Sequence, residues 1–125
     1  MDKWFSLQVS LAAPEKAAPT AEMLAQHPAF DIKNPNRFRA VFGGLKANTA
    51  GFHHGSGNSY ALLADWLIKL DAINPQTTAR ISSAFDTWKR YDADRQSKMQ
   101  AALKRIAQTP DLSGDTTEMV TRILG

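Results

Sequence analysis

The three histidines of this sequence are the side chains best suited to metal or acid–base chemistry. A zinc hydrolase places two imidazoles and a carboxylate base on one face of a helix, which gives motifs such as H-E-x-x-H their spacing. Here His27 is followed by a proline, and His53 and His54 are adjacent, so their side chains point in different directions in most backbone conformations. A metal role for the pair stays open as the minor alternative. We predict loop histidines and no metal site.

Other motifs for catalysis or phosphate binding are incomplete. Gly55-Ser56-Gly57 is a turn of the kind that exposes N–H groups to anions, but the lysine and hydroxyl of G-x-x-x-x-G-K-S/T are missing. Cysteine is absent, which excludes thiolate nucleophiles, thiolate metal sites and disulfides. Because no nucleophile, base and orienting group can be assembled, we predict no catalytic residue in this chain.

Basic and aromatic residues adjoin one another from Trp88 to Tyr91, and further basic residues follow on the next predicted helix. Such a cluster is typical either of an anion or nucleic-acid surface or of a solvated helix face whose aromatic residues pack into the core. The net charge of +3 is small for a dedicated nucleic-acid-binding protein. We favour the solvated face and expect no nucleic-acid partner.

Gln76 and Arg80 are the pair with the clearest geometric case for a binding role. They lie four residues apart in the first turns of a predicted helix, so both side chains point from one side of it. There Arg80 offers a forked cation to a carboxylate or carbonyl group. On spacing alone, an exposed polar edge is the simpler interpretation.

The elements that position these residues are predicted from the periodicity of apolar side chains. Five stretches place such residues at i, i+3, i+4 and i+7, the pattern of an amphipathic helix, although the fifth begins with a polar residue. The stretches are Phe38-Val41-Phe42-Leu45, Leu63-Trp66-Leu67-Leu70, Ile81-Ala84-Phe85-Trp88, Met99-Ala102-Leu103-Ile106 and Thr116-Met119-Val120-Ile123. No stretch shows the period of two that is typical of strands, so we predict an all-α protein.

Helix starts are marked by short polar side chains, which can accept hydrogen bonds from the unpaired N–H groups of a first turn. Asn34-Pro35 and Asn74-Pro75 each combine an Asn N-cap with a proline at the first helical position. Asp92 is predicted to cap the next helix, and either Ser113 or Asp115 the last one.

Glycine and proline predict the breaks between helices. We expect Gly43-Gly44 to interrupt the Phe38 helix and Thr109-Pro110 to stop the Met99 helix. Residues 14–19 are predicted to be a linker, followed by a helix that Thr20 caps, and residues 49–59 are predicted to be an ordered loop.

The two Asn-Pro starts lie 40 residues apart, close to the repeat length of HEAT and armadillo proteins. Short links between the helices favour stacked antiparallel helical hairpins, in a right-handed α-α superhelix, over a closed four-helix bundle. We predict a single helical domain over residues 1–125, with N-terminal helices and a linker in 1–26 and helical hairpins in 27–125. No stretch approaches the ~20 apolar residues of a membrane-spanning helix and no signal peptide is present, so we expect no membrane partner and a cytoplasmic location.

Seven short strings occur in the order and at the spacing found in the C-terminal domain of bacterial aminopeptidase N, the alanyl aminopeptidase of the M1 family of zinc metallopeptidases. These strings are Asp2-Lys3-Trp4-Phe5, His27-Pro28-Ala29-Phe30, Asn34-Pro35-Asn36-Arg37, Phe52-His53, Asn74-Pro75-Gln76, Lys89-Arg90-Tyr91-Asp92 and Leu112-Ser113-Gly114-Asp115. The chain resembles this family over nearly its whole length, from Asp2 to Leu124.

The resemblance implies a parent enzyme that removes N-terminal residues from peptides and holds zinc in a separate catalytic domain, outside this chain. It implies that this domain carries no cofactor, docks on the catalytic domain and controls the access of peptide substrates. On the same resemblance, Arg39, Gln76 and Arg80 match positions that line the substrate cavity. The alternative function is a stand-alone helical-repeat module that binds peptide or nucleic acid.

Overall fold

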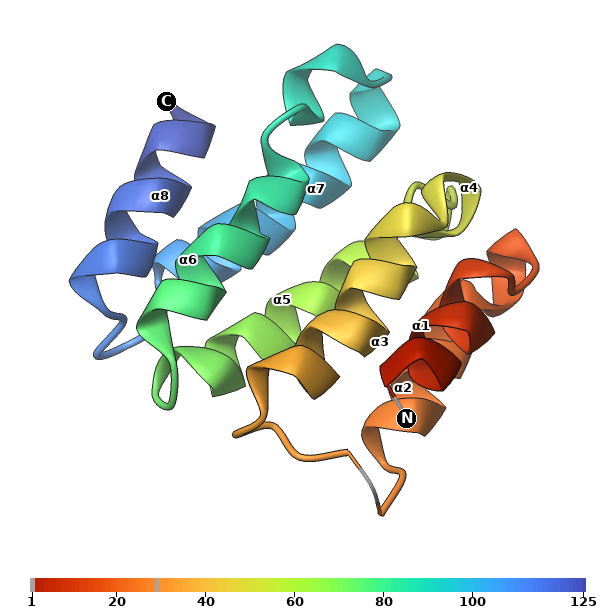
Figure 1. The fold of residues 1–125 in the computed structure, drawn as a ribbon. Coiled ribbons are helices and arrows are strands. Elements are labelled where there is room, and N and C mark those ends of the chain that lie inside the picture. The colour runs from red at the N-terminus through yellow and green to blue at the C-terminus, as the bar shows by residue number, and fades with distance from the viewer. Residues whose placement is uncertain (1, 29) are drawn as a thin grey trace. The chain divides into compact units, whose positions relative to one another are not determined.

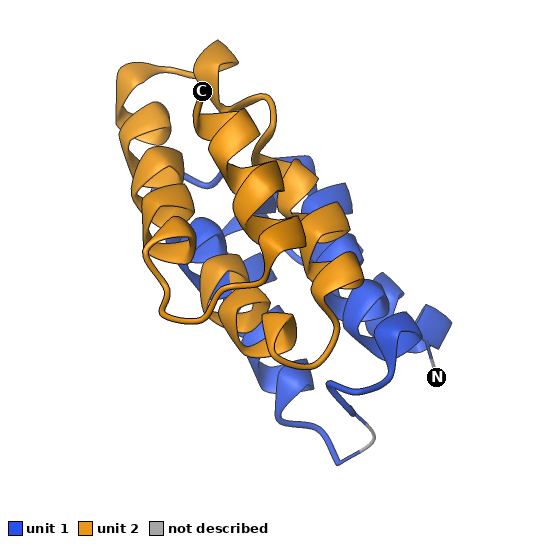
Figure 2. Ribbon diagram, turned by 90° about the vertical axis from the view of Figure 1, so that its left-hand side faces the viewer, with its two compact units in different colours: residues 1–62 blue, residues 63–125 orange. Residues whose placement is uncertain are grey.

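The computed structural model describes residues 2–28 and 30–125, which form helices and turns with no strand among them (Figure 1). The predicted all-α fold is therefore confirmed. Met1 and Ala29 lie outside the described residues, so the His27–Phe30 motif is described only in part. The chain divides into two compact units, residues 1–62 and 63–125, which Figure 2 colours blue and orange. The prediction of a single domain, with a division at residue 26, stays a prediction.

The first unit is built from the N-terminal helices. It contains α1 (Asp2–Ser10), the 3₁₀ turn η1 (Pro14–Lys16), α2 (Ala17–Ala25), α3 (Pro35–Ala47), α4 (Thr49–Phe52) and the start of α5 (Asn58–Asp71). Helix α1 packs on α3 and α2. Its core includes fully buried aromatic side chains, because the amphipathic faces of these helices turn toward one another. They are Phe5, Phe38, Phe42, Phe52 and Tyr60.

The second unit begins within α5. It continues through α6 (Pro75–Ser82), the 3₁₀ turns η2 (Ser83–Phe85) and η3 (Trp88–Arg90), α7 (Ala93–Ala107) and α8 (Gly114–Leu124). Helix α8 packs on both α6 and α7. The predicted stripe of α7 is wholly buried, and so are most members of the stripes from α5 to η3, with Trp66 and Ile81 partly exposed.

The N-caps predicted for α3, α6, α7 and α8 are confirmed. The Asn34 side chain accepts hydrogen bonds from the backbone N–H groups of Asn36 and Arg37, and Asn74 accepts one from Thr77. Asp92 caps α7 in the same way. Of the two candidates for α8, the cap is Ser113, whose hydroxyl accepts from Thr116 N–H at 3.2 Å.

The expected interruption at Gly43-Gly44 is wrong, because α3 continues through both glycines to Ala47. Gly44 lies where α1 crosses α3, and a Cβ at this position would be 2.9 Å from the backbone oxygen of Ser6 and 3.3 Å from Val9 Cβ. The missing side chain allows the two backbones to approach. Gly44 is thus a contact point between helices rather than a helix end.

Two stretches predicted to be irregular are partly helical. Helix α2 starts at Ala17, before the predicted Thr20 cap, and Pro19 occupies its first turn, where the N–H is not needed. Between residues 49 and 59, helix α4 forms because the Asn48 side chain accepts a hydrogen bond from Gly51 N–H at 2.9 Å. Gly57 (φ 75°) then provides the left-handed turn before α5.

The stripe from Ile81 to Trp88 is not one continuous α-helix, since α6 ends at Ser82 and two 3₁₀ turns follow. The hydroxyls of Thr78, Ser82 and Ser83 donate to the backbone carbonyls of Asn74, Thr78 and Arg80 at 2.7 to 2.9 Å. Such bonds bend helices and compete with the regular backbone pattern. Ala84, Phe85 and Trp88 nevertheless stay buried.

The carboxyl of Asp92, the N-cap of α7, has a pKa below its ordinary value. The hydrogen bond from the Arg95 guanidinium, at 2.9 Å, is the main cause that lowers the pKa of this carboxyl, and the Arg95 backbone N–H adds to it. Since the folded-state pKa is lowered, ionised Asp92 stabilises the fold above the ordinary aspartate pKa. This contribution is lost as the pH falls through the lowered value.

We therefore expect an NMR titration to give Asp92 a pKa below its ordinary value of 3.8, and Arg95→Ala to raise it. Asp92→Asn is the control, because an asparagine side chain can still cap α7 but has no carboxyl group that titrates. An Asp92 pKa that is the same with and without the Arg95 side chain would contradict this assignment.

Candidate functional site

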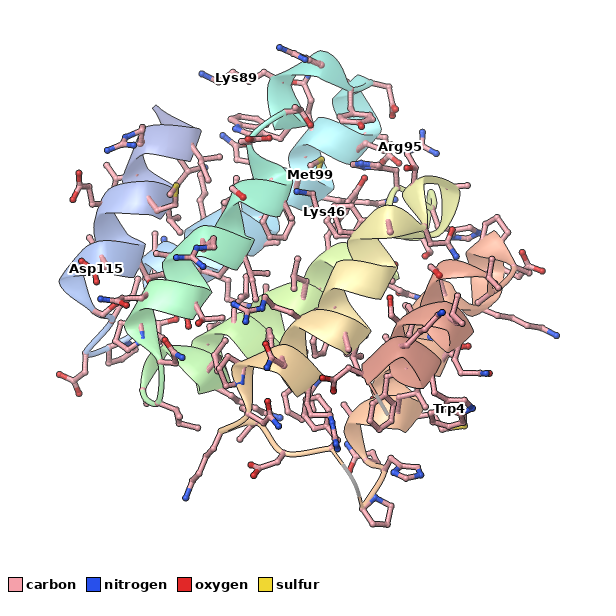
Figure 3. All side chains as sticks on the ribbon, viewed as in Figure 1. Trp4, Lys46, Lys89, Arg95, Met99 and Asp115 are labelled. Atoms are coloured by element: carbon pink, nitrogen blue, oxygen red, sulfur yellow. The ribbon has the colours of Figure 1, made fainter. Side chains whose placement is uncertain are left out.

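Helices α6 and α8 line an open pocket of about 550 Å³ within the second unit. Gln76, Ala79 and Arg80 line it from α6. Asp115, Glu118, Met119 and Arg122 line it from α8, and Figure 3 labels Asp115 on that helix. The structure therefore brings the predicted pair Gln76 and Arg80 together in one concave site.

Both members of this pair are available to a ligand. Asn74 and Pro75 fix the start of α6, and the spacing of four residues then places Gln76 and Arg80 on the same face. Both are exposed, and among residues 2–28 and 30–125 neither side chain has a hydrogen-bond or ion-pair partner. An unpaired guanidinium beside an amide can bind a carboxylate or peptide carbonyl through forked N–H donors.

The wall of the pocket formed by α8 was not predicted from the sequence. Glu118 and Arg122 form an exposed ion pair at 3.0 Å, as expected for opposite charges four residues apart. The Asp115 carboxylate has no partner among the described residues and lines the same pocket as Arg80. The pocket thus presents one unpaired cation and one unpaired anion, which suits a ligand that carries groups of both signs.

Arg39, the third predicted cavity residue, belongs to the first unit. It lies in α3, is partly buried, and donates from Nη2 to Asn36 Oδ1 at 2.8 Å, within the same helix. Its part in a substrate cavity stays a prediction.

His53 and His54 lie just before α5 and bond to side chains of the turn and of α5. His53 Nδ1 lies 2.6 Å from Tyr60 Oη, and His54 Nδ1 lies 3.0 Å from Ser56 Oγ. The Ser56 hydroxyl also accepts from Asn58 N–H, so polar groups of the glycine-rich turn bond to one another. No three His, Cys, Asp or Glu side chains of the described ranges lie close enough to hold a metal ion. The donors present do not fit zinc.

The basic and aromatic cluster is largely a charge-balanced helix surface. Arg95 pairs with Asp92, Lys98 with Asp94 and Arg105 with Asp65, at 2.7 to 2.9 Å. Trp88 is 7% exposed and donates from Nε1 to the Ile123 carbonyl at 2.9 Å. The predicted packing of Trp88 in the core is confirmed. Acidic partners reduce the positive potential that phosphate binding requires.

In the part of the chain that the structure describes, no helix has both the length and the apolar character required to cross a membrane.

Comparison with known proteins places the fold in a family. A family model described as Domain of unknown function (DUF3458_C) ARM repeats matches residues 1–125. Aminopeptidase N of Escherichia coli K12 is 41% identical over 125 residues, which cover 99% of this chain and 14% of that protein. Aminopeptidase N of Caulobacter vibrioides is 40% identical over 126 residues, which cover all of this chain and 14% of that protein.

A solved structure agrees with these matches. The crystal structure of Legionella pneumophila aminopeptidase A in complex with aspartic acid shares 35% sequence identity and a TM-score of 0.90, over 98% of this chain and 14% of that one. This chain therefore spans only 14% of the length of each of the three proteins. The predicted armadillo-like class of helical fold is confirmed by the ARM-repeat match. Matches of this extent show that the chain belongs to the DUF3458_C family of ARM-repeat domains, the C-terminal domain of bacterial aminopeptidase N.

Proposed function

We propose that this chain is the non-catalytic C-terminal domain of an M1-family zinc aminopeptidase, that it docks on the catalytic domain of the longer enzyme, and that it controls the access of peptide substrates in the cytoplasm. The similarity of the whole chain to two aminopeptidases N supports this proposal. Because the donors present do not fit zinc, no step of hydrolysis is assigned to residues of this chain.

The observation that carries the proposal is the unpaired Arg80 guanidinium beside Gln76 in the pocket between α6 and α8. A peptide has backbone carbonyls and a terminal carboxylate, which can accept hydrogen bonds from the Arg80 guanidinium. Its backbone N–H groups can donate hydrogen bonds to the Gln76 side-chain carbonyl. Asp115 adds an acceptor for an ammonium or guanidinium group of the peptide. These residues would hold the peptide beyond its scissile bond, so they act on binding and orientation.

Arg80→Ala in the full-length parent enzyme tests this assignment. We expect kcat/KM for longer peptides to fall about fivefold, the equivalent of roughly 1 kcal/mol for an exposed charged contact. Hydrolysis of a short aminoacyl arylamide should be unchanged, because it does not reach the pocket. The measurement is steady-state kinetics over peptides of increasing length, together with zinc content.

Arg90→Ala is the matched control, since Arg90 is exposed in η3 of the same unit and does not line the pocket. Unchanged kinetics of the Arg80 variant with long and short peptides alike would remove Arg80 from the site. The alternative, a stand-alone interaction module, would gain support if the isolated chain bound RNA with a steep salt dependence and failed to associate with the catalytic domain.

A further inference from the structure

The first turn of α8 carries an acidic side chain on a backbone that buried hydrogen bonds hold in place. Asp115 lies between Ser113 and Thr116. The Ser113 N–H, the Ser113 hydroxyl and the Thr116 hydroxyl all donate to the carboxylate of Asp71, which is 5% exposed. Asp71 in turn lies three residues before Asn74, the N-cap of α6. The backbone that carries Asp115 is therefore fixed close to the start of α6.

Two opposite charges of the pocket between α6 and α8 are left for a ligand. The Asp115 carboxylate is exposed and lines the pocket from α8 (Figure 3). Within the described ranges it has no hydrogen-bond or ion-pair partner, and neither has the Arg80 guanidinium, which lines the pocket from α6. Glu118 and Arg122, the other charged residues of the lining, form an ion pair with each other at 3.0 Å. The pocket thus offers a ligand one cation on α6 and one anion on α8.

A peptide substrate can bring only certain cations to the Asp115 carboxylate. Because an aminopeptidase removes the N-terminal residue, the terminal ammonium of its substrate must lie at the catalytic centre and not in this pocket. Beyond the N-terminal residue, the side chains of a peptide that are fully charged cations at neutral pH are lysine and arginine. Both bind a carboxylate through charge-assisted hydrogen bonds, whereas an acidic side chain in the same place is repelled.

We propose that Asp115 is a specificity-determining residue of the parent enzyme, which favours peptide substrates with a lysine or arginine side chain beyond the N-terminal residue. This inference rests on the proposed function, because it takes the pocket to be open to the peptide. Arg80 binds an acceptor group of the same peptide, so the two charges together select which segment of the peptide lies along the pocket. Since the backbone around Asp115 is already ordered, binding costs little further conformational entropy there.

Steady-state kinetics of the full-length parent enzyme test the proposal with oligoalanine peptides in which a single lysine or glutamate is moved along the chain. We expect kcat/KM to be about fivefold higher for lysine than for glutamate at one position, as is typical of an exposed ion pair. Asp115→Asn should bring this ratio to about one, and Asp115→Lys should invert it. Asp115→Asn alone decides the matter if the lysine variant does not fold. Added salt should weaken the lysine preference of the unmodified enzyme, because it screens exposed charges.

Asp94→Asn is the matched control. Asp94 occupies in α7 the position that Asp115 occupies in α8, the second residue after the N-cap, but it does not line the pocket. Both substitutions remove an acid from the first turn of a helix, where it interacts favourably with the helix dipole, so both should lower stability slightly. Only the Asp115 variant should change the ratio between lysine and glutamate peptides.

A ratio that is the same in the unmodified enzyme and in both Asp115 variants would overturn the proposal. If Arg80→Ala still slowed the hydrolysis of longer peptides in that case, the proposed function would stand and the role of Asp115 alone would be lost. If Arg80→Ala instead had no effect on peptides of any length while Asp115→Asn abolished the lysine preference, the assignment of Arg80 would fail and that of Asp115 would remain.

Discussion

Asp71→Ala is expected to lower the free energy of unfolding of this chain by about 3 kcal/mol, since it leaves several part-buried donors without an acceptor. Asp71 ends α5, is 5% exposed, and accepts from Ser113 N–H at 2.7 Å, Ser113 Oγ at 2.7 Å and Thr116 Oγ1 at 2.5 Å. One carboxylate therefore fixes the start of α8 on the end of α5. Loss of the Asp71 carboxylate leaves Ser113, the N-cap of α8, without its hydrogen-bond acceptor.

The measurement is urea unfolding followed by circular dichroism, with Asp86→Ala as the matched control. Asp86 is exposed and its carboxylate has no partner among the described residues, so its removal should change stability by less than about 0.5 kcal/mol. Asp71→Asn should fall between the two, because one oxygen can still accept from the hydroxyls while the amide faces Ser113 N–H. Equal stability of the Asp71→Ala and Asp86→Ala variants would show that the carboxylate does not hold α8.

Gly44→Ala and Gly43→Ala are expected to change stability in opposite directions, although the two glycines are neighbours in α3. A Cβ on Gly44 would lie 2.9 Å from the Ser6 backbone oxygen, so α1 must shift, at a cost of about 2 kcal/mol. A Cβ on Gly43 meets nothing within 4 Å. There the higher helix propensity of alanine should stabilise the chain by about 0.5–1 kcal/mol.

Thermal and urea unfolding of the two single variants would measure both effects, and each variant serves as the control for the other. Two stabilising substitutions would mean that α1 does not cross α3 at Gly44. Two equally destabilising ones would indicate that the glycine pair acts through backbone conformation rather than through the helix contact.

Features that depend on near neighbours in the sequence could be predicted well. Asn34, Asn74 and Asp92 cap their helices as expected, because each cap bonds to N–H groups two or three residues along the chain. The buried stripe of α7 follows from helix period alone. The predicted helix interruption at Gly43-Gly44 was wrong, because the role of Gly44 depends on its contact with Ser6 in a different helix.

In the candidate site, too, the features set by one helix could be predicted from the sequence, whereas those set by contacts between helices could not. The geometry of one helix was enough to pair Gln76 with Arg80. The opposite wall, with Asp115 and Arg122, required knowledge of how α8 packs on α6, and no local pattern shows that. For Arg39, the spacing in the sequence gave no link to the other two residues, and its cavity role still rests on the family resemblance.

Asn48 makes the end of α1 depend on residues far along the chain. Its Nδ2 donates to the carbonyls of Val9 and Ala12 at 3.0 and 2.8 Å, while its Oδ1 accepts from Gly51 N–H. The Val9 carbonyl near the end of α1 also accepts from Ala12 N–H at 3.2 Å, and Asn48 adds a second donor to it from the junction of α3 and α4. The residues on either side of Leu11 are therefore tied by one amide side chain to a helix junction that lies 36 to 39 residues further along the chain.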